Sequence, residues 1–381
     1  MCNFLLPNIC MQNNIHIHLS VTYNNSVHPY INKSLSTYLN NIKSEIEIYS
    51  NSWDRYKKYT NPYEYIHTSI DGIKLPVCKL KPLSRSYFKM IELYPICNIN
   101  DNGEIKTFHF AEGPGGFIEA LCHIRKNNKD IYYGMTLHDD NDKNVPGWIK
   151  TNNFIKNHPN VIIETGKDYK GDITNAENLL YCFNKYNNSI DLVTGDGGVD
   201  FSTDFNNQEI VGLKLILCQI AFTIAVQKHN GCCIIKFFDI FTRASVELLY
   251  LLSNIYQEVI IVKPNTSRCA NSEKYIICKK FRLSNTKYLV EKFYTIIKNF
   301  DNEKNIVSIL NIDIPYLFIS KIQECNAILG QQQIENISNT INLIENQNNN
   351  DKINNIKYVN INKCTVWCQK NKLPYNVISE F

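Results

Sequence analysis

Short apolar runs alternate with helical stretches between residues 76 and 282, and this alternation restricts the fold of the chain more than any other feature. The runs are rich in β-branched and aromatic residues, as strands are. Strands and helices that alternate in this way form βαβ units, so the sequence predicts an α/β fold with a mainly parallel sheet and helices on both faces. We expect strands at 107–111, 131–135, 161–164, 190–194, 232–236, 259–262 and 275–278, and the clearest helices at 117–126, 207–228 and 243–255.

Only loop-like residues, 263–274, separate the last two expected strands, so this pair is expected to run antiparallel. The two ends of the chain lack the alternation. Residues 1–75 are polar, with one expected helix at 34–49, and residues 283–381 show no further strands. The Asn- and Gln-rich part of that second region, 330–355, predicts a loop or poorly ordered linker, followed by a short helix at 364–371. We therefore expect one α/β domain, 76–282, between two extensions of unknown role.

Composition excludes several classes of protein. The 40 Lys and Arg against 36 Asp and Glu leave a formal net charge of +4, which allows a local basic surface without demanding a nucleic-acid partner. The 14 Cys form no CxxC pair, so neither a disulfide scaffold nor a zinc site is expected. The start lacks the features of a secretory signal. The most apolar helical run, 210–226, contains Lys214 and Gln219 and is shorter than a membrane span. We expect an intracellular, cytoplasmic protein without membrane contact; a nuclear location stays open.

A glycine-rich turn follows the first expected strand and precedes a helix. Gly113, Gly115 and Gly116 let the backbone approach a ligand closely, and the following helix offers free N–H groups. Tight geometry alone also produces such turns. The third glycine of the dinucleotide motif is missing, because Phe117 follows Gly116, and this counts against a nicotinamide-dependent dehydrogenase. Glu112 before the glycines suits a ligand that carries an amino group, which favours S-adenosylmethionine.

Four charged residues stand where burial would be costly without a partner or a function. Lys89 lies in an expected helix, Asp196 and Lys236 lie at the ends of strands, and Glu273 precedes the last strand. Each has an ordinary explanation: a solvated strand end, a surface loop charge or common turn chemistry. A parallel sheet would nevertheless bring the three at strand ends together beside the glycine turn.

These segments resemble the FtsJ-like (RrmJ-type) methyltransferase superfamily, and more narrowly the cap-specific mRNA 2′-O-methyltransferases of eukaryotes and large DNA viruses. The resemblance extends over residues 83–281 and implies a Rossmann-like S-adenosylmethionine-dependent methyltransferase sheet, mostly parallel with one antiparallel strand. Its motifs are AEGPGGF at 111–117, GMTL at 134–137, GDIT at 171–174, GDGG at 195–198, LCQ at 217–219, KFFDIFT at 236–242, KP at 263–264 and NSEKY at 271–275.

The resemblance also implies residue roles. The segment after the second strand, 136–137, lacks the acid that contacts the cofactor ribose in bacterial relatives, and the chemistry requires no metal. Lys236 is expected to act as the base, as a neutral amine that partial burial and the charge of Lys89 would favour. The implied catalytic residues are Lys89, Asp196, Lys236 and Glu273; the implied cofactor-binding residues are Glu112, Gly113, Pro114, Gly115, Gly116, Phe117, Asp172 and Asp196; and Arg85 and Arg268, with Lys263 and Lys274, are the candidates for RNA binding.

The expected function is transfer of a methyl group from S-adenosylmethionine to a ribose 2′-hydroxyl of capped mRNA, converting cap-0 to cap-1. Two other functions stay open: methylation of ribosomal or transfer RNA by the same chemistry, and a non-catalytic RNA-binding subunit with the same fold. The extensions are candidates for contact with other capping enzymes or RNA polymerase. If the protein is viral, a virus factory or virion would be its expected location.

Overall fold

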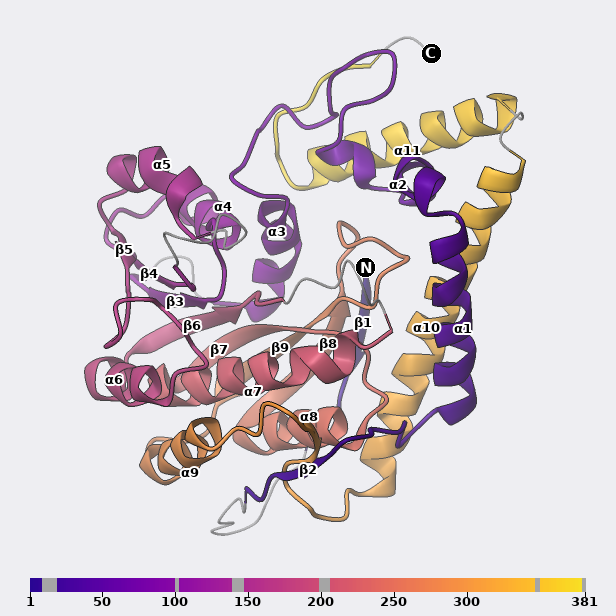
Figure 1. Ribbon diagram of the computed structural model, residues 1–381. Coiled ribbons are helices and arrows are strands. Elements are labelled where there is room, and N and C mark those ends of the chain that lie inside the picture. The colour runs from indigo at the N-terminus through magenta and orange to yellow at the C-terminus, as the bar shows by residue number, and fades with distance from the viewer. Residues whose placement is uncertain (9–18, 100–102, 139–146, 199–205, 347–349, 379–381) are drawn as a thin grey trace.

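The computed structural model describes residues 1–8, 19–99, 103–138, 147–198, 206–346 and 350–378. Within these ranges, eight strands form one mixed sheet in the order β1-β8-β9-β7-β6-β3-β4-β5 (Figure 1). The strands are β1 (Cys2–Leu5), β3 (Lys106–Phe110), β4 (Ile131–Met135), β5 (Val161–Ile163), β6 (Ile190–Gly195), β7 (Gln227–Phe237), β8 (Tyr256–Lys263) and β9 (Lys274–Phe281).

Strand directions confirm the predicted, mostly parallel sheet. Strands β3 to β7 pair parallel with one another, whereas β9 lies antiparallel between β7 and β8, as expected for the last two strands. The expectation of a single antiparallel strand is wrong, because β1 also pairs antiparallel, with β8. This four-residue strand lies in the polar N-terminal region, where its pattern is too short to detect, and it covers the otherwise open edge of β8.

Helices cover both faces of the sheet, as predicted (Figure 1). One face carries α3 (Ser86–Cys97), α4 (Gly116–Arg125) and α5 (Asn152–Asn157), with the 3₁₀ helix η2 (Ile149–Thr151) before α5. The other face carries α6 (Ala176–Tyr186), α7 (Gln208–Val226), α8 (Arg243–Ile255) and α9 (Lys287–Lys298).

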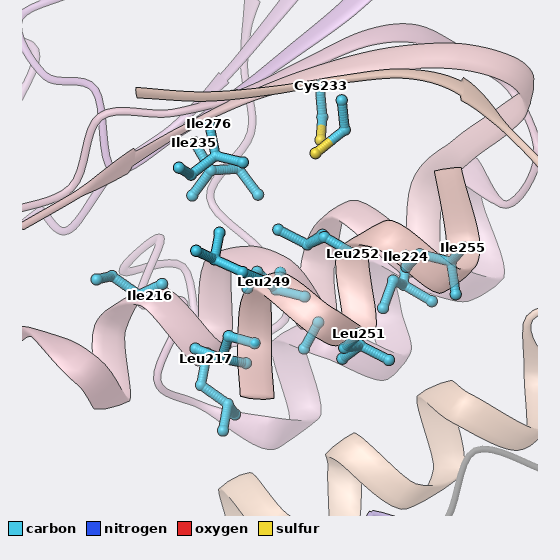
Figure 2. Packing of buried hydrophobic residues seen from close by; sticks show 14 of the residues in the cluster. Ile216, Leu217, Ile224, Cys233, Ile235, Leu249, Leu251, Leu252, Ile255 and Ile276 are labelled. Atoms are coloured by element: carbon cyan, nitrogen blue, oxygen red, sulfur yellow. The ribbon is translucent and has the colours of Figure 1, made fainter. Parts of the chain in front are cut away.

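Alternation of side chains along the buried strands divides the interior into two cores. On β7, Cys233 and Ile235 belong to the core beneath α7 and α8, whereas Ile234 faces the core on the side of α3 and α4. Figure 2 shows Cys233, Ile235 and Ile276 opposite the leucines and isoleucines of those helices. In the part of the chain described, α7 is long and apolar enough to cross a membrane, but 78% of its apolar window is buried, as the predicted core helix would be.

The two extensions pack together along one side of the domain (Figure 1). Helix α1 (Lys33–Ile48) confirms the helix expected at 34–49 and lies against the long helix α10 (Tyr316–Glu345). The N-terminal region adds β2 (Thr22–Asn24), which pairs with β10 (Asn305–Ser308), a strand the sequence analysis missed. The other elements are α2 (Ser50–Thr60), η1 (Glu64–Ile66) and α11 (Asn350–Lys370).

The prediction of a loop or linker at 330–355 is wrong. Residues 330–345 form the second half of α10 and residues 350–355 begin α11, while 347–349 lie outside the described residues. Ile334, Ile337, Ile341 and Ile344 are buried at helical spacing, and this apolar stripe holds the helix although asparagine and glutamine dominate the composition. The short helix expected at 364–371 is the end of α11.

Candidate functional site

The glycine turn joins β3 to α4 at the carboxyl edge of the parallel strands, where α/β sheets bind ligands. Gly115 is the N-cap of α4 and has φ 99°, a conformation that favours glycine. A Cβ on Gly116 would lie 2.3 Å from the hydroxyls of Ser84 and Ser86. A Cβ on Gly113 would lie 2.6 Å from the Gly147 backbone oxygen, so the chain's own packing and backbone geometry require all three glycines. Phe117 is a fully buried core residue, and the Pro114 carbonyl accepts a hydrogen bond from Thr151.

Glu112 is buried under this turn with an incomplete set of partners. One carboxylate oxygen accepts the Phe117 N–H, whereas Oε2 is buried without a hydrogen-bond partner in the described part of the chain. Burial raises the pKa of Glu112 well above its ordinary value, and the nearby Asp196 carboxylate adds to this effect. A buried acceptor of this kind suits a ligand with a positively charged donor.

Thr136 connects the glycine turn to the loop that carries Asp172. The Gly113 N–H donates to Thr136 Oγ1 at 3.4 Å, and a Cβ on Gly171 would lie 2.2 Å from the Thr136 carbonyl oxygen. Thr136 therefore lies between the glycine turn and the loop at 171–174 and contacts both. The Asp172 carboxylate itself accepts the backbone N–H and hydroxyl of Thr174, so it shapes its own loop.

The four predicted charged residues converge at the same edge of the sheet. Lys89 on α3 lies 2.8 Å from Glu273 Oε2, and Lys236, at the end of β7, donates to the Asp196 backbone oxygen at 2.7 Å and lies 3.4 Å from its Oδ1. The two pairs are linked by Tyr275, which accepts from Lys89 at 3.3 Å and donates to Asp196 at 2.7 Å. The sequence motifs predicted no role for Tyr275.

Tyr275 reaches this position because β9 pairs with β7 in a register that sets Tyr275 opposite Lys236. Both ends of its network are largely buried: the side-chain exposures of Lys89 and Glu273 are 6% and 11%, and those of Lys236 and Asp196 are 11% and 12%. The sequence signal was present in the NSEKY motif, but a tyrosine in a buried strand reads first as a core residue.

Glu273 is held in its ionised form by its basic neighbours. Burial opposes its ionisation, but the charges of Lys89, Lys236 and Arg85 outweigh burial and hold the pKa of Glu273 well below its usual range. Its second oxygen accepts the Ser267 hydroxyl at 2.7 Å. Glu273 is therefore an ionised carboxylate with both oxygens satisfied inside the protein.

The basic residues expected to contact RNA are mostly engaged within the fold. Arg268 forms a bidentate ion pair with Glu64, with N–O distances of 3.0 and 2.6 Å. Burial opposes ionisation of Glu64, but Arg268 lowers the pKa of Glu64 to about 2. Lys263 donates to neutral oxygens of Asn271 and Glu273. Lys274 is buried and donates to the Phe238 carbonyl. Arg85, the N-cap of α3, is half-buried.

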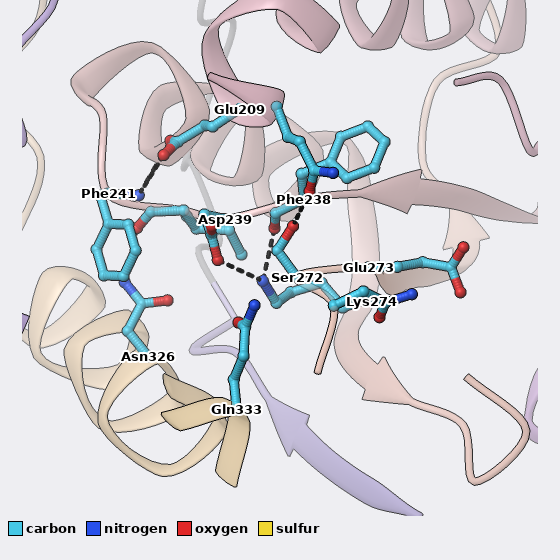
Figure 3. A network of polar contacts seen from close by, with 12 residues as sticks. Glu209, Phe238, Asp239, Phe241, Ser272, Glu273, Lys274, Asn326 and Gln333 are labelled. Carbon is cyan, nitrogen blue, oxygen red and sulfur yellow. Dashed lines mark hydrogen bonds and ion pairs between the residues drawn. The ribbon is translucent and has the colours of Figure 1, made fainter. Parts of the chain in front are cut away.

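The extensions contact the loops that follow Lys236 and precede Glu273 (Figure 3). From α10, the side-chain amide of Asn326 donates to the Ile240 carbonyl at 2.7 Å and that of Gln333 donates to the Ala270 carbonyl at 2.9 Å. From α1, Lys43 lies 2.7 Å from Asp239. A cavity of about 90 Å³ lies between α10 and these loops, and its walls include Lys263, Lys274 and Gln333.

The sheet order and the ligand-type edge place the chain in the Rossmann-like class of α/β proteins. A comparison with family models narrows this class: the model described as FtsJ-like methyltransferase matches residues 82–281, just over half of the chain. The chain belongs to the FtsJ-like methyltransferase family, whose members generally use S-adenosylmethionine.

The chain is also similar to curated cap-specific mRNA (nucleoside-2′-O-)-methyltransferases 1. The mouse protein is 32% identical over 231 residues (58% of this chain and 27% of the relative), and the Dictyostelium discoideum protein 29% over 308 residues (74% and 39%). An inactive relative, 1B of Caenorhabditis briggsae, is 27% identical over 264 residues (64% and 30%). The chain thus spans less than half of these relatives, and they give the expected viral kinship no support.

Among solved structures, the chain is similar to a putative ribosomal RNA methyltransferase from Plasmodium falciparum. The sequence identity is 21% and the TM-score is 0.38, and the match covers 52% of this chain and 98% of the other.

Proposed function

We propose that the protein is an S-adenosylmethionine-dependent RNA ribose 2′-O-methyltransferase that acts on capped mRNA and converts cap-0 to cap-1. The observation that carries this proposal is the convergence of Lys89, Asp196, Lys236 and Glu273 in one network beside the glycine turn. Similarity to cap-specific methyltransferases supports capped mRNA as the substrate. Because one relative is described as inactive, activity has to be measured directly.

The residues around the glycine turn fit the cofactor. Oε2 of Glu112, which has no partner in the described part of the chain, would accept the amino group of its methionine part, and Thr136 contacts both the glycine turn and the loop of Asp172. When bound, S-adenosylmethionine supplies an electrophilic methyl group, so that an O–C bond forms on the ribose as the S–C bond breaks.

In this mechanism Lys236 is the group that accepts the proton of the 2′-hydroxyl. Asp196 holds the Lys236 amine through its backbone oxygen and its carboxylate, and Tyr275 fixes that carboxylate from the other side. Lys89 and Glu273 compensate each other's charge at the far end of the network. Positioning the hydroxyl against both the methyl group and the amine would supply much of the rate enhancement.

The test is transfer of labelled methyl to three RNAs: cap-0, uncapped and structured ribosomal RNA. The wild type is compared with Lys236→Ala, and Lys228→Ala is the matched control because it removes an exposed lysine from the other end of β7. Label at the first ribose of cap-0 RNA alone, lost in Lys236→Ala and kept in Lys228→Ala, is the expected result.

Each alternative predicts a different outcome of the same assay. Label on uncapped or ribosomal RNA would favour a ribosomal or transfer RNA 2′-O-methyltransferase. Cofactor binding without label on any RNA would favour a non-catalytic RNA-binding subunit. We propose an intracellular site of action, with the extensions as the surfaces for other capping enzymes or RNA polymerase.

A further inference from the structure

The loop between β8 and β9, residues 264–273, carries Glu273 and is held by Lys263 at its base. The Lys263 amine donates three short hydrogen bonds, at 2.7 Å to the Asn271 backbone oxygen, 2.7 Å to Asn271 Oδ1 and 2.6 Å to the Glu273 backbone oxygen. The last residue of β8 thus bonds directly to the end of the loop, and one amine closes it.

All three acceptors of Lys263 are neutral oxygens, so the amine needs all three protons of its charged form to satisfy them. Other contacts hold the middle of the loop: Glu92 accepts the Asn265 and Thr266 N–H groups at 2.9 Å each, and Arg268 pairs with Glu64. Only Lys263 bonds the backbone of Glu273 itself among these contacts. Loss of one proton would therefore release part of the end of the loop that sets Glu273 against Lys89.

We propose that Lys263 is a positioning residue of the methyltransferase site, and that its protonated amine holds Glu273 in place by closing the 264–273 loop. The catalytic consequence rests on the proposed function, whereas closure of the loop does not. Lys263 acts through Glu273 and is not expected to touch the RNA or the cofactor.

The surroundings place the loss of this proton close to neutral pH. Burial lowers the pKa of Lys263 to about 7. Glu273 opposes this shift, Lys274 and Lys89 add to it, and the Cys269 thiol and the Asp239 carboxylate also face the amine. At pH values below this pKa, three hydrogen bonds close the loop. As the pH rises through the pKa of Lys263, the loop loosens. Activity is therefore expected to fall on the alkaline side because of Lys263.

The first experiment compares pH profiles of kcat for the wild type, Lys263→Met and Lys263→Arg. Lys263→Met should lose at least about tenfold in kcat, with unchanged affinity for S-adenosylmethionine and without the alkaline decline due to Lys263. Arginine keeps its charge, so Lys263→Arg should recover part of the activity and hold it to higher pH. The matched control is Lys279→Met, which removes a partly buried lysine, paired with Glu258, from the far end of β9.

The second experiment measures opening of the loop and does not depend on methyltransferase activity. Limited trypsin digestion of the folded full-length protein reports opening of the loop through cleavage after Arg268. Cleavage should be several-fold faster in Lys263→Met than in the wild type at the same pH, and close to wild type in Lys263→Arg and Lys279→Met. Asn271→Ala removes one acceptor only and should give a smaller change, which serves if Lys263→Met folds poorly.

Two results would overturn the inference: a wild-type alkaline decline that Lys263→Arg leaves unchanged, or a Lys263→Met variant with wild-type kcat and wild-type trypsin cleavage. Failure of the proposed function looks different. A wild type that methylates no RNA, but whose loop opens when Lys263 is replaced, would refute the methyltransferase assignment and leave the loop-closing role intact.

Discussion

Two glutamates at the same edge of the sheet, Glu112 and Glu273, are both buried but stand in opposite electrostatic states. Glu273 has an ammonium group and a hydroxyl on its two oxygens, and its pKa lies below the usual range. Glu112 has one backbone donor and one orphaned oxygen, and its pKa lies well above the ordinary value. Burial acts on both in the same direction, so the difference comes from their partners.

This contrast separates the site into a part that the chain completes and a part that it leaves open. The network of Lys89, Glu273, Tyr275, Asp196 and Lys236 satisfies its own charges without a ligand. Glu112 does not, because its Oε2 is buried without a partner among the described residues, and a cationic ligand would supply one. Substitutions in the network should therefore lower both the stability and the activity of the protein. Substitution of Glu112 should act mainly on ligand binding.

The largest effect is expected for Lys89→Met. It leaves the Glu273 carboxylate buried without its ammonium partner, which should lower the free energy of unfolding by about 3 kcal/mol. Methyl transfer should fall by roughly a thousandfold, because the charge balance of the network is lost. The measurements are urea unfolding and single-turnover transfer. In the double variant Lys89→Met/Glu273→Gln most of the stability should return and the activity should not; a double variant as unstable as Lys89→Met would contradict the pairing.

Glu112→Gln should weaken binding of S-adenosylmethionine about tenfold or more, because a charged hydrogen bond is lost. The raised pKa fixes the sign of the pH dependence. Between the ordinary and the raised value the folded apo protein holds a proton that the unfolded chain releases, so wild-type stability falls as pH rises through this window. Ionisation of Glu112 also strengthens its attraction for a cation, so wild-type cofactor affinity rises with pH.

Titration calorimetry and denaturant unfolding at several pH values test both trends, which Glu112→Gln should lack. Glu209→Gln is the control. Burial raises the pKa of Glu209 too, but the backbone N–H groups of Phe241 and Thr242 already satisfy its carboxylate. An equal loss of cofactor affinity in both variants would refute a specific role of Glu112 in cofactor binding.

Tyr275→Phe tests the link between the two ion pairs. Removal of the hydroxyl takes a donor from Asp196 and should cost about 1–2 kcal/mol of stability, with roughly a tenfold loss of kcat if Asp196 orients Lys236. Tyr132→Phe is the matched control, because Tyr132 donates to Asp130 in a buried position at the opposite end of the sheet. Similar stability losses with a kcat decline only in Tyr275→Phe would support the assignment; equal kcat in both variants would refute it.

The sequence was sufficient for the parts of this site that local pattern encodes. The glycine turn and the four charged residues stand at strand ends or in short motifs, and a parallel sheet brings its carboxyl ends to one edge. The role of Tyr275 could not be predicted, because it depends on the insertion of β9 between β7 and β8, which sets Tyr275 opposite Lys236. The sequence predicted that the last two strands pair, but not that β9 also pairs with β7.

The helices of the C-terminal extension were not predictable from composition, for a different reason. Asparagine and glutamine suggested a loop, yet a few isoleucines at helical spacing suffice once α1 and α2 provide a surface to pack against. That surface is tertiary and leaves no local signal. The same packing turns Asn326 and Gln333 into contacts with the loops of the site, a role that the sequence analysis could not assign to the extension.

The smallest effects are expected where α10 supports those loops. Gln333→Ala removes one hydrogen bond to the Ala270 carbonyl and should lower stability by about 1 kcal/mol, with a decline of kcat of only a few-fold because Lys263 and Arg268 still hold the loop. Gln331→Ala, on the exposed side of the same helix, should change neither. The extension is thus expected to affect stability and kcat through the loops of the charged network, while cofactor affinity stays constant. A Gln333→Ala variant that loses cofactor affinity would show instead that the two sides are coupled through α10.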